Sequence, residues 1–361
     1  MRFPEFEGEW KKKKLGDIAN ITGGGTPNTD IEEYWNGEIH WFTPSEIKSA
    51  YVDKSVRTIT ELGLVKSSAK LLPAGAILLT TRATIGEVAI AQKECCTNQG
   101  FQSLVVNDGI NNIFIANWIK QNKNELTKRA KGSTFAEISK SEVEKIPLVI
   151  PNTDEQNKIA KFLTLLDERI ATQNKIIEQY KSLIKGLTHF VLNGKQANTR
   201  LKDCVACNSS TLTESEFEGI NGLHPVYGAT GIIAYSSQYA VDENSILIIK
   251  DGASVGRVQY VTGKYSAIGT LNYLTAKSGF SLKYIYYLLS YFNFDKYKVG
   301  SGIPHIYFKD YGNELIYCPS IKEQNKIARI LWQVEKKIDL EQILLDAYSL
   351  QKQYLLKNML I

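Results

Sequence analysis

The sequence has little of what marks membrane, secreted and disulfide-stabilised proteins. Its longest apolar run, near Tyr284–Leu289, is far shorter than the roughly 20 residues that a membrane-spanning helix needs. The first residues lack the basic-then-apolar layout of a secretory signal. Five cysteines, an odd number in 361 residues, do not make a disulfide framework. We therefore expect a cytoplasmic protein without a membrane span.

The short motifs of common nucleotide-handling and DNA-modifying enzymes are also missing. There is no G-x-x-x-x-G-K-[ST] phosphate loop, and Gly23-Gly24-Gly25 does not open a helix. The Asn/Asp-Pro-Pro-aromatic tetrapeptide of amino-methyltransferases does not occur. Asp30 with Glu46-Ile47-Lys48 fits a two-metal nuclease only loosely, and Cys204-x-x-Cys207 is half of a zinc site. We expect no cofactor and no metal, and a binding protein rather than an enzyme.

The charge balance is close to neutral. There are 43 Lys and Arg against 38 Asp and Glu, a formal net charge of +5, which by itself does not indicate nucleic-acid binding. One segment is locally basic, with Glu125 as the only opposing acid, and it contains Lys120, Lys123, Lys128, Arg129 and Lys131.

The chain repeats itself, which decides its organisation. Glu155-Gln156-Asn157-Lys158-Ile159-Ala160 recurs as residues 323–328, and Ala83–Val88 resembles Ala253–Val258. We infer a tandem duplication with the order globular unit, helix, globular unit, helix. The expected boundaries are 1–150, 151–195, 196–318 and 319–361.

Both globular units read as mixed α+β and rich in strands. Short apolar runs bounded by turn residues predict strands, and longer amphipathic runs predict helices. The expected strands are Ala76–Thr81, Val88–Ala91, Ser245–Lys250 and Val258–Val261, and the expected helices are Phe114–Gln121 and Leu282–Tyr291. The second unit holds 14 of the 19 tyrosines and the first only two, so the two units present different surfaces.

Two long heptad patterns predict helices that pack against each other as a coiled coil. Capping boxes are expected at their starts, Thr153 with Gln156 and Ser320 with Glu323. Gln173 and Glu341 are polar at the same repeat position, so antiparallel packing would place them opposite each other. The seam residues are Leu163, Ile170, Gln173, Ile177, Leu331, Ile338, Glu341 and Leu345.

These features resemble a known family, the specificity subunits of type I restriction–modification enzymes. Pro-x-x-x-Glu-Gln-x-Lys-Ile-Ala opens each long helix, at Pro151 and Pro319. Phrases similar to target-recognition domains include Gly24-Gly25-Thr26-Pro27, Thr80–Gly86 and Pro225–Gly231. The second unit is shorter and lacks a Gly-Gly-x-Thr-Pro equivalent.

The resemblance implies an α+β fold of two β-rich target-recognition domains separated by two long antiparallel coiled-coil helices. It implies a non-catalytic subunit that reads a split, asymmetric site on double-stranded DNA. It also implies partners: two adenine-N6 methyltransferase subunits and the restriction (motor) subunits. Two other readings stay open: a self-contained nuclease or methyltransferase with unrecognised motifs, and a coiled-coil interaction module that never touches DNA.

The candidate DNA-contacting residues follow strand-like runs in both units, where polar side chains can reach base edges and phosphates. In the first unit they are Thr26, Trp41, Arg82, Thr84, Asn98, Gln99, Lys131 and Ser133. In the second unit they are Tyr227, Lys250, Ser254, Arg257 and Ser301.

Overall fold

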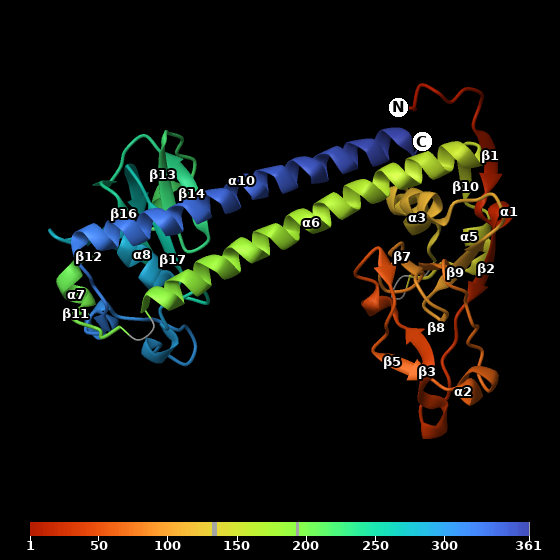
Figure 1. Cartoon of the computed structure of the whole chain (residues 1–361), viewed down its shortest axis with the longest axis horizontal. Coiled ribbons are helices and arrows are strands. Elements are labelled where there is room, and N and C mark those ends of the chain that lie inside the picture. The colour runs from red at the N-terminus through yellow and green to blue at the C-terminus, as the bar shows by residue number, and fades with distance from the viewer. Residues whose placement is uncertain (132–135, 193–194, 361) are drawn as a thin grey trace. The chain divides into compact units, whose positions relative to one another are not determined.

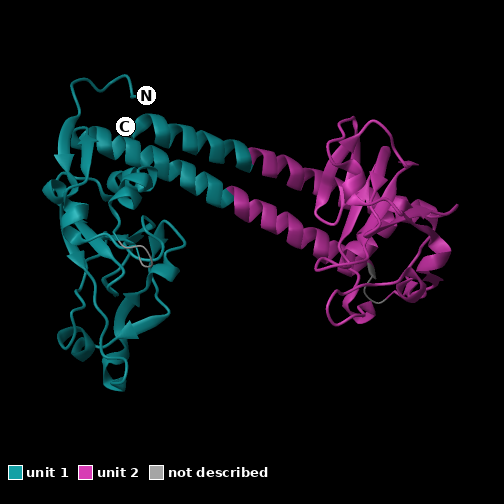
Figure 2. Cartoon of the chain, turned by 180° about the vertical axis from the view of Figure 1, so that it is seen from behind, with its two compact units in different colours: residues 1–172, 345–361 teal, residues 173–344 magenta. Residues whose placement is uncertain are grey.

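The computed structural model describes residues 1–131, 136–192 and 195–360, and these form two compact units (Figure 2). Unit 1 comprises residues 1–172 and 345–361, and unit 2 comprises residues 173–344. Two long helices, α6 (Thr153–Leu192) and α10 (Ile321–Met359), are labelled in Figure 1. Each contributes one segment to unit 1 and one to unit 2 (Figure 2). The mixed α+β class and the two long helices are as the sequence predicts.

Unit 1 is built on two sheets and a short strand pair. The five-stranded sheet has the order β2 (Ala19–Gly23), β9 (Gln102–Val106), β6 (Ile77–Leu79), β7 (Val88–Ala91), β4 (Tyr51–Val52). The three-stranded sheet has the order β5 (Arg57–Ile59), β3 (Trp35–Phe42), β8 (Cys95–Thr97), and β1 (Lys11–Lys14) pairs with β10 (Pro147–Ile150). The helices are α1 (Leu15–Ile18), α2 (Glu61–Val65), α3 (Asn112–Gln121), α4 (Lys123–Arg129) and α5 (Lys140–Glu144).

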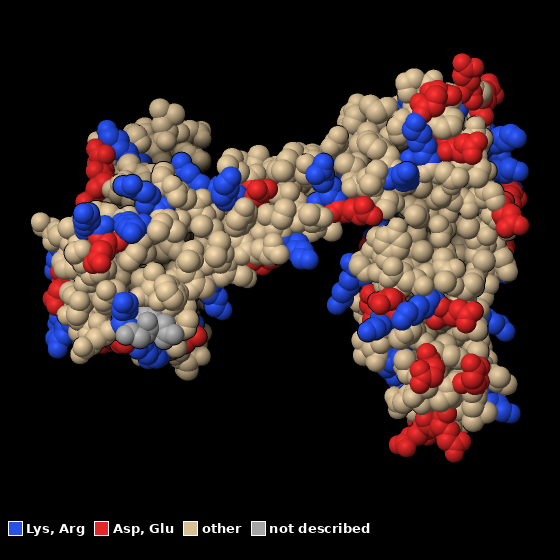
Figure 3. All heavy atoms as spheres, viewed as in Figure 1, with Lys and Arg blue, Asp and Glu red and all other residues tan. Residues whose placement is uncertain are grey.

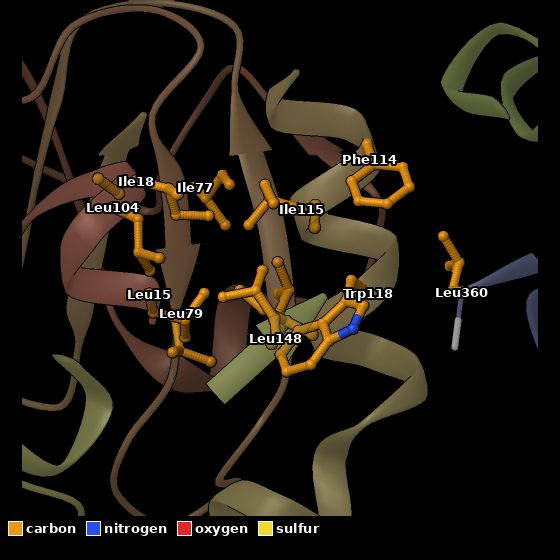
Figure 4. Close-up of a cluster of buried hydrophobic side chains, with 14 of the residues drawn as sticks. Leu15, Ile18, Ile77, Leu79, Leu104, Phe114, Ile115, Trp118, Leu148 and Leu360 are labelled. Carbon is orange, nitrogen blue, oxygen red and sulfur yellow. The ribbon is translucent and has the colours of Figure 1, made fainter. Parts of the chain in front are cut away.

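Strand β6 shows why a continuous apolar run forms this sheet. Successive side chains of a strand point to opposite faces. Ile77 and Leu79 therefore join the core under α3, together with Phe114 (Figure 4), whereas Leu78 joins a separate core with Phe42. All three strand residues are fully buried. A sheet covered on both faces needs apolar residues at every position, which is the pattern of Ile77–Leu79.

Unit 2 repeats this plan. One four-stranded sheet has the order β12 (Val205–Ser209), β19 (Leu271–Ala276), β16 (Ser245–Ile249), β17 (Val258–Val261), and the other has the order β14 (Gly231–Ser236), β13 (His224–Gly228), β18 (Lys264–Ala267), β15 (Val241–Asp242). Strand β11 (Thr199–Arg200) pairs with β20 (Leu315–Ile316), and the helices are α7 (Leu201–Cys204), α8 (Leu282–Ser290) and α9 (Phe308–Tyr311). The strands and helices expected near 76–91, 114–121, 245–261 and 282–291 are confirmed, with small differences at their ends.

The two long helices begin in related but not identical ways. The capping box predicted at Ser320 is confirmed, because Ser320 N donates to the Glu323 carboxylate and Glu323 N donates to Ser320 Oγ. The box predicted at Thr153 is wrong by one position. Asn152 is the cap, since its Oδ1 accepts from Glu155 N at 2.9 Å, and the Thr153 hydroxyl donates to Gly109 O instead.

The repeated glutamine explains why the sequence motif recurs. Gln156 Nε2 donates to Pro151 O at 3.0 Å, and its Oε1 accepts from the backbone N–H at the cap of α3. Gln324 makes the same two bonds, to Pro319 O and from Ser281 N at the cap of α8. Both side chains are buried. In each unit this amide therefore ties the start of the long helix to the helix before it.

In each unit the α6 and α10 segments pack antiparallel. In unit 1, Lys352 forms an ion pair with Asp167, and Leu163 and Leu355 share a buried cluster. In unit 2, Gln173 Nε2 donates to the carbonyl and carboxylate of Glu341, and Ile184 packs with Leu331. Residue numbers rise along one helix as they fall along the other. The two polar residues that the heptad pattern places opposite each other are thus in contact.

The remaining seam residues are all at least partly buried. Leu163, Ile177 and Leu331 are buried, and Ile170, Ile338 and Leu345 are half-buried.

None of the helices in the described part of the chain combines the length and hydrophobicity that a membrane crossing requires.

Candidate functional site

In unit 1 the polar segments that follow β2 and β8 meet each other. Gly25 N donates to Thr97 O at 2.9 Å, and the Thr26 hydroxyl donates to Gln99 Oε1 at 2.5 Å. Asn98 N donates to Phe42 O at the end of β3. Residues far apart in sequence therefore form one surface at the ends of three strands.

The glycines before Thr26 are required by this close approach. A Cβ on Gly24 would overlap the carbonyl oxygen of Asn98, and one on Gly25 would overlap the hydroxyl oxygen of Ser68. Because both positions are far inside van der Waals contact, only glycine fits. Gly23-Gly24-Gly25 is thus a packing segment that positions Thr26.

The loop between β6 and β7, residues 80–87, joins the same surface. Thr81 N donates to Gly100 O at 2.8 Å, and Thr81 O accepts from Ile138 N. The next residue, Arg82, pairs with Glu137 through a backbone bridge and an ion pair of 2.8 Å. Glu137 also exchanges two backbone hydrogen bonds with Lys131. In this Arg82–Glu137–Lys131 ladder, the side chains of Arg82 and Glu137 are 45% and 38% exposed, so their ion pair lies at the surface.

Unit 2 builds the same ladder from different side chains. Lys250 N donates to Thr270 O and Lys250 O accepts from Ile306 N, as Thr81 does in unit 1. The following residue, Asp251, bridges to His305, which exchanges two backbone bonds with Val299. Asp251, His305 and Val299 therefore occupy the places of Arg82, Glu137 and Lys131. A cation–acid–cation set in unit 1 is replaced by an acid, an imidazole and an apolar side chain.

The predicted contact residues divide by exposure. Seven are exposed: Arg82, Thr84, Gln99, Lys131, Ser254, Arg257 and Ser301. Four are half-buried: Thr26, Asn98, Tyr227 and Lys250. Ser133 lies outside the described residues. The structure thus leaves polar side chains of both units open at the loops that follow β6 and β16.

Trp41 is corrected by the structure, because its side chain is only 4% exposed. Its indole N–H donates to Gly25 O at 2.8 Å, and its ring meets Trp35 edge-on at 5.2 Å. Arg57 stacks over Trp35 with 3.5 Å to the ring centroid. Trp41 therefore supports the glycine segment from inside and is not open to a base.

Two half-buried candidates also have structural partners. The Asn98 side chain accepts from Gly100 N at 2.8 Å, which closes a turn of its own segment. Tyr227 packs edge-on against Tyr265, and burial followed by the nearby Tyr235 raises the pKa of its phenol. Both residues shape the surface more than they project from it.

Sequence reasoning missed Glu137 and His305. Ile138 aligns with Ile306 when the repeat is superposed on itself, and the residues just before them are Glu137 and His305. That alignment was the available signal. It could not show that the two residues face Arg82 and Asp251, since the pairing joins segments that are distant in sequence.

Two residues that enter the enzyme alternatives, Glu46 and Cys204, make structural contacts. Glu46, the acid of the nuclease-like triplet, caps its own turn by accepting from Thr43 N and Val56 N. No group of three or more His, Cys, Asp or Glu among these residues could hold a metal ion. Cys204 lies 3.6 Å from Cys318 Sγ, and this contact together with burial keeps the pKa of the Cys204 thiol above the usual range.

Lys and Arg side chains are interspersed with Asp and Glu over the face shown in Figure 3. No single field of one sign covers either unit on that face.

Comparisons with known proteins agree on one family. The sequence model described as "Type I restriction modification DNA specificity domain" matches residues 7–182 and 198–347. The type I restriction enzyme MjaIX specificity subunit of Methanocaldococcus jannaschii is 30% identical, over 86% of this chain and 83% of that protein. The EcoprrI specificity subunit of Escherichia coli is 24% identical, over 90% of this chain and 87% of that protein.

Solved structures share the fold. The crystal structure of a type I restriction–modification S subunit from M. genitalium superposes with a TM-score of 0.69, at 18% identity, covering 100% of this chain and 99% of that one.

Proposed function

Because the chain belongs to the family of type I restriction–modification specificity subunits, we propose that its two units read the two halves of a split, asymmetric DNA site. Specificity subunits are the non-catalytic, DNA-recognising members of such enzymes. The proposed target-recognition domains are residues 1–150 and 196–318, and the proposed spacer segments are 151–195 and 319–361. We propose that the protein acts in the cytoplasm, where it can reach the DNA.

The observation that carries this proposal is the pair of equivalent ladders. Both units hold the same backbone bridge after the central strand, yet they present Arg82 and Glu137 in one case and Asp251 and His305 in the other. Arg suits the acceptors of guanine, whereas Asp suits the amino group of cytosine. One scaffold with two side-chain sets would read two different half-sites.

The length of the helices supports a fixed spacing between those half-sites. Helix α6 has 40 residues, so at 1.5 Å per residue it is about 60 Å long. An antiparallel pair of that length would hold the two domains on one face of the DNA, more than one helical turn apart. We propose an unread gap of roughly 5–8 bp.

The partners are proposed to be two adenine-N6 methyltransferase subunits and the restriction subunits. Helix α10 exposes large apolar side chains in both units, which suits docking of other chains. In unit 2 these include Leu340 at 60% and Ile343 at 66% exposed, and in unit 1 Leu350 at 66%. Single exposed apolar residues are common on protein surfaces. Several of them on one helix suit a surface that another chain covers in a complex.

Methylome sequencing tests the proposal. Cells would express the chain with its methyltransferase subunit, and the methylated adenines would be mapped. We expect a bipartite motif with a fixed gap. The double variant Asp251→Ala, His305→Ala should relax or change one half only, whereas Lys337→Glu, an exposed residue of α10, should change neither. A contiguous motif, or two altered halves, would contradict the split reading.

The gap itself has a separate test. Inserting one heptad into each long helix, after Lys175 and at the matched position of α10, keeps the seam in phase and should lengthen the gap. Both half-sites should remain unchanged in sequence.

The purified chain alone should neither cleave DNA with Mg²⁺ nor transfer a methyl group, and either activity would favour the enzyme alternative.

A further inference from the structure

In unit 1, residues 1–10 form a strap over the start of α6. The Arg2 guanidinium donates to both oxygens of Glu155 at 2.7 Å, and Glu155 is fully buried. Phe3 meets Phe162 edge-on at 5.8 Å. Lys158 forms an ion pair with Glu5 and lies over the Phe3 ring. The strap thus binds through a basic residue, an aromatic residue and an acid, in that order.

The strap also reaches the end of α10. Met1 N donates to Asn358 O, so the covered surface lies between the start of one long helix and the end of the other. Trp10 continues the contact by packing edge-on against Phe114 of α3. Every one of these partners belongs to unit 1.

The repeat places the same surface in unit 2, where it is open. In the alignment that pairs Glu155 with Glu323, Lys158 and Phe162 correspond to Lys326 and Ile330, and Asn358 corresponds to Phe190. All four unit 2 residues line one groove of about 520 Å³, together with Tyr317. We name it the unit 2 groove.

Exposure shows that the described residues leave the equivalent helix face of unit 2 uncovered. Glu155 is 0% exposed under the strap, whereas Glu323 is exposed. Ile330 is 45% and Phe190 is 78% exposed, which is unusual for large apolar side chains at one place. The reason lies in the chain order. Ten residues precede β1 in unit 1, whereas only six separate α6 from β11 in unit 2.

We propose that the unit 2 groove binds an extended segment of a different protein, not of a second copy of this chain, with the chemistry of the strap: a basic residue, an aromatic residue next to it, and an acid two residues further on. Glu323 receives the basic group and Lys326 receives the acid. Ile330 and Phe190 cover the aromatic ring. The occupied surface of unit 1 supplies the template, because the same two charges stand at the same helix positions.

Peptide binding to the full chain tests this. The probe is a fluorescently labelled peptide with the sequence of residues 1–10, titrated into the protein and followed by anisotropy. We expect saturable binding at one peptide per chain. Ile330→Asp and Glu323→Lys should each weaken it about tenfold or more, because each removes a central contact. The control Lys337→Glu, on the same helix about 21 Å beyond Glu323, should leave it unchanged.

Exchanging the charges of Glu323 and of the peptide's Arg2 distinguishes binding at this groove from nonspecific binding. Glu323→Lys should bind a peptide carrying Arg2→Glu better than it binds the unchanged peptide, whereas the unaltered protein should show the reverse order. Because Glu323 also caps α10, thermal melting of each variant checks that unit 2 is folded, and Ile330→Asp tests the groove without touching the cap.

Three results would overturn the proposal. Absence of saturable binding is the first, and binding that neither groove variant changes is the second, since the peptide would then be exchanging with the strap of unit 1. The third is a concentration-dependent dimer that Ile330→Asp dissociates, measured by sedimentation velocity, which would make the strap of a second copy the occupant instead.

Discussion

The two units use one motif, Glu-Gln-Asn-Lys-Ile-Ala, in two ways. Gln156 and Gln324 make the same pair of backbone hydrogen bonds, because both of their partners lie inside the repeated unit. Glu155 is buried under Arg2, whereas Glu323 is exposed at its own cap. The strap that contains Arg2 has no counterpart among the described residues of unit 2. A repeated residue thus keeps its role when its partner is repeated with it and changes its role when the partner is not.

The recognition ladders show the same separation between backbone and side chain. The bridges Arg82–Glu137 and Asp251–His305 are equivalent because backbone pairing does not depend on the side chain. The side chains themselves are at least partly exposed and lie outside the hydrophobic cores, so they can differ without loss of the fold. We therefore expect the ladder side chains to differ between the two units while the backbone structure beneath them stays the same.

Alkaline pH should distinguish the units most strongly. Burial, with the nearby Glu335, raises the pKa of Tyr286 to about 12, and burial raises the pKa of Tyr284 and Tyr311 as well. Since the folded pKa lies above the ordinary value of about 10, this stabilisation is complete below pH 10 and is lost as pH rises through about 12. We expect unit 2 to unfold in that range.

Two optical signals report the units separately. Fourteen of 19 tyrosines lie in residues 196–319, so tyrosinate absorbance follows unit 2. Four of the five tryptophans, Trp10, Trp35, Trp41 and Trp118, lie in unit 1, so tryptophan fluorescence follows that unit. In unit 1, burial raises the pKa of the Cys95 and Cys96 thiols from about 9 to about 12, so these two groups weaken unit 1 from about pH 9 upward. Because they are fewer than the buried tyrosines of unit 2, we expect unit 1 to unfold at the higher pH. A fluorescence change that precedes the tyrosinate signal would contradict this order.

Removing the strap cation should cost more than removing the unit 2 carboxylate. Arg2→Ala leaves the fully buried Glu155 without its ionic partner, which should lower the free energy of unfolding by more than the loss of a helix cap does. Glu323→Ala removes only a capping interaction and should cost about 1 kcal/mol. Urea denaturation measures both values, and equal costs would show that Arg2 does not compensate the buried charge.

Arg82→Ala should weaken binding of the methyltransferase complex to its specific DNA by about 1–3 kcal/mol if the guanidinium contacts a base through two hydrogen bonds. The matched substitution Asp251→Ala tests the equivalent place of unit 2 and should alter the other half-site. Fluorescence anisotropy on specific and non-specific duplexes gives both numbers. Unchanged binding of Arg82→Ala to both duplexes would remove Arg82 from the interface.

The smallest effect is expected at the polar pair of the seam. Gln173→Leu with Glu341→Leu should raise stability by about 1 kcal/mol, since apolar packing commonly replaces a buried polar pair without loss. Gln173→Leu alone should destabilise, because the Glu341 carboxylate loses its donor. If the pair fixes register, the methylated gap of the double variant becomes mixed in length. One unaltered gap length would count against that role.

Much of the fold could be predicted because its signals are local. The apolar run Ile77–Leu79, the heptad seam through Leu163 and Ile177, and the cap at Ser320 each depend on residues within a few turns or one strand. The contact between Gln173 and Glu341 could also be predicted, since the repeat fixes which positions face each other in an antiparallel pair.

The candidate functional site was harder to predict from the sequence, and the reason is physical. Trp41 is an aromatic residue of a kind that can contact DNA bases. Its burial depends on Gly25 and Trp35, and no local sequence pattern shows that these residues meet. Glu137 was missed because its partner Arg82 is far away along the chain, and only folding brings the two side chains into contact.

By itself the sequence determined the duplication, the element types, the two long helices and the family, because these follow from periodicity and from motifs along the chain. Only the tertiary structure decided which loops share one surface, that Asp251 and His305 stand where Arg82 and Glu137 stand, and that Glu155 is covered while Glu323 is not. Those facts depend on contacts between distant segments, and identical local sequence acquires different surroundings wherever one copy has a neighbour that the other lacks.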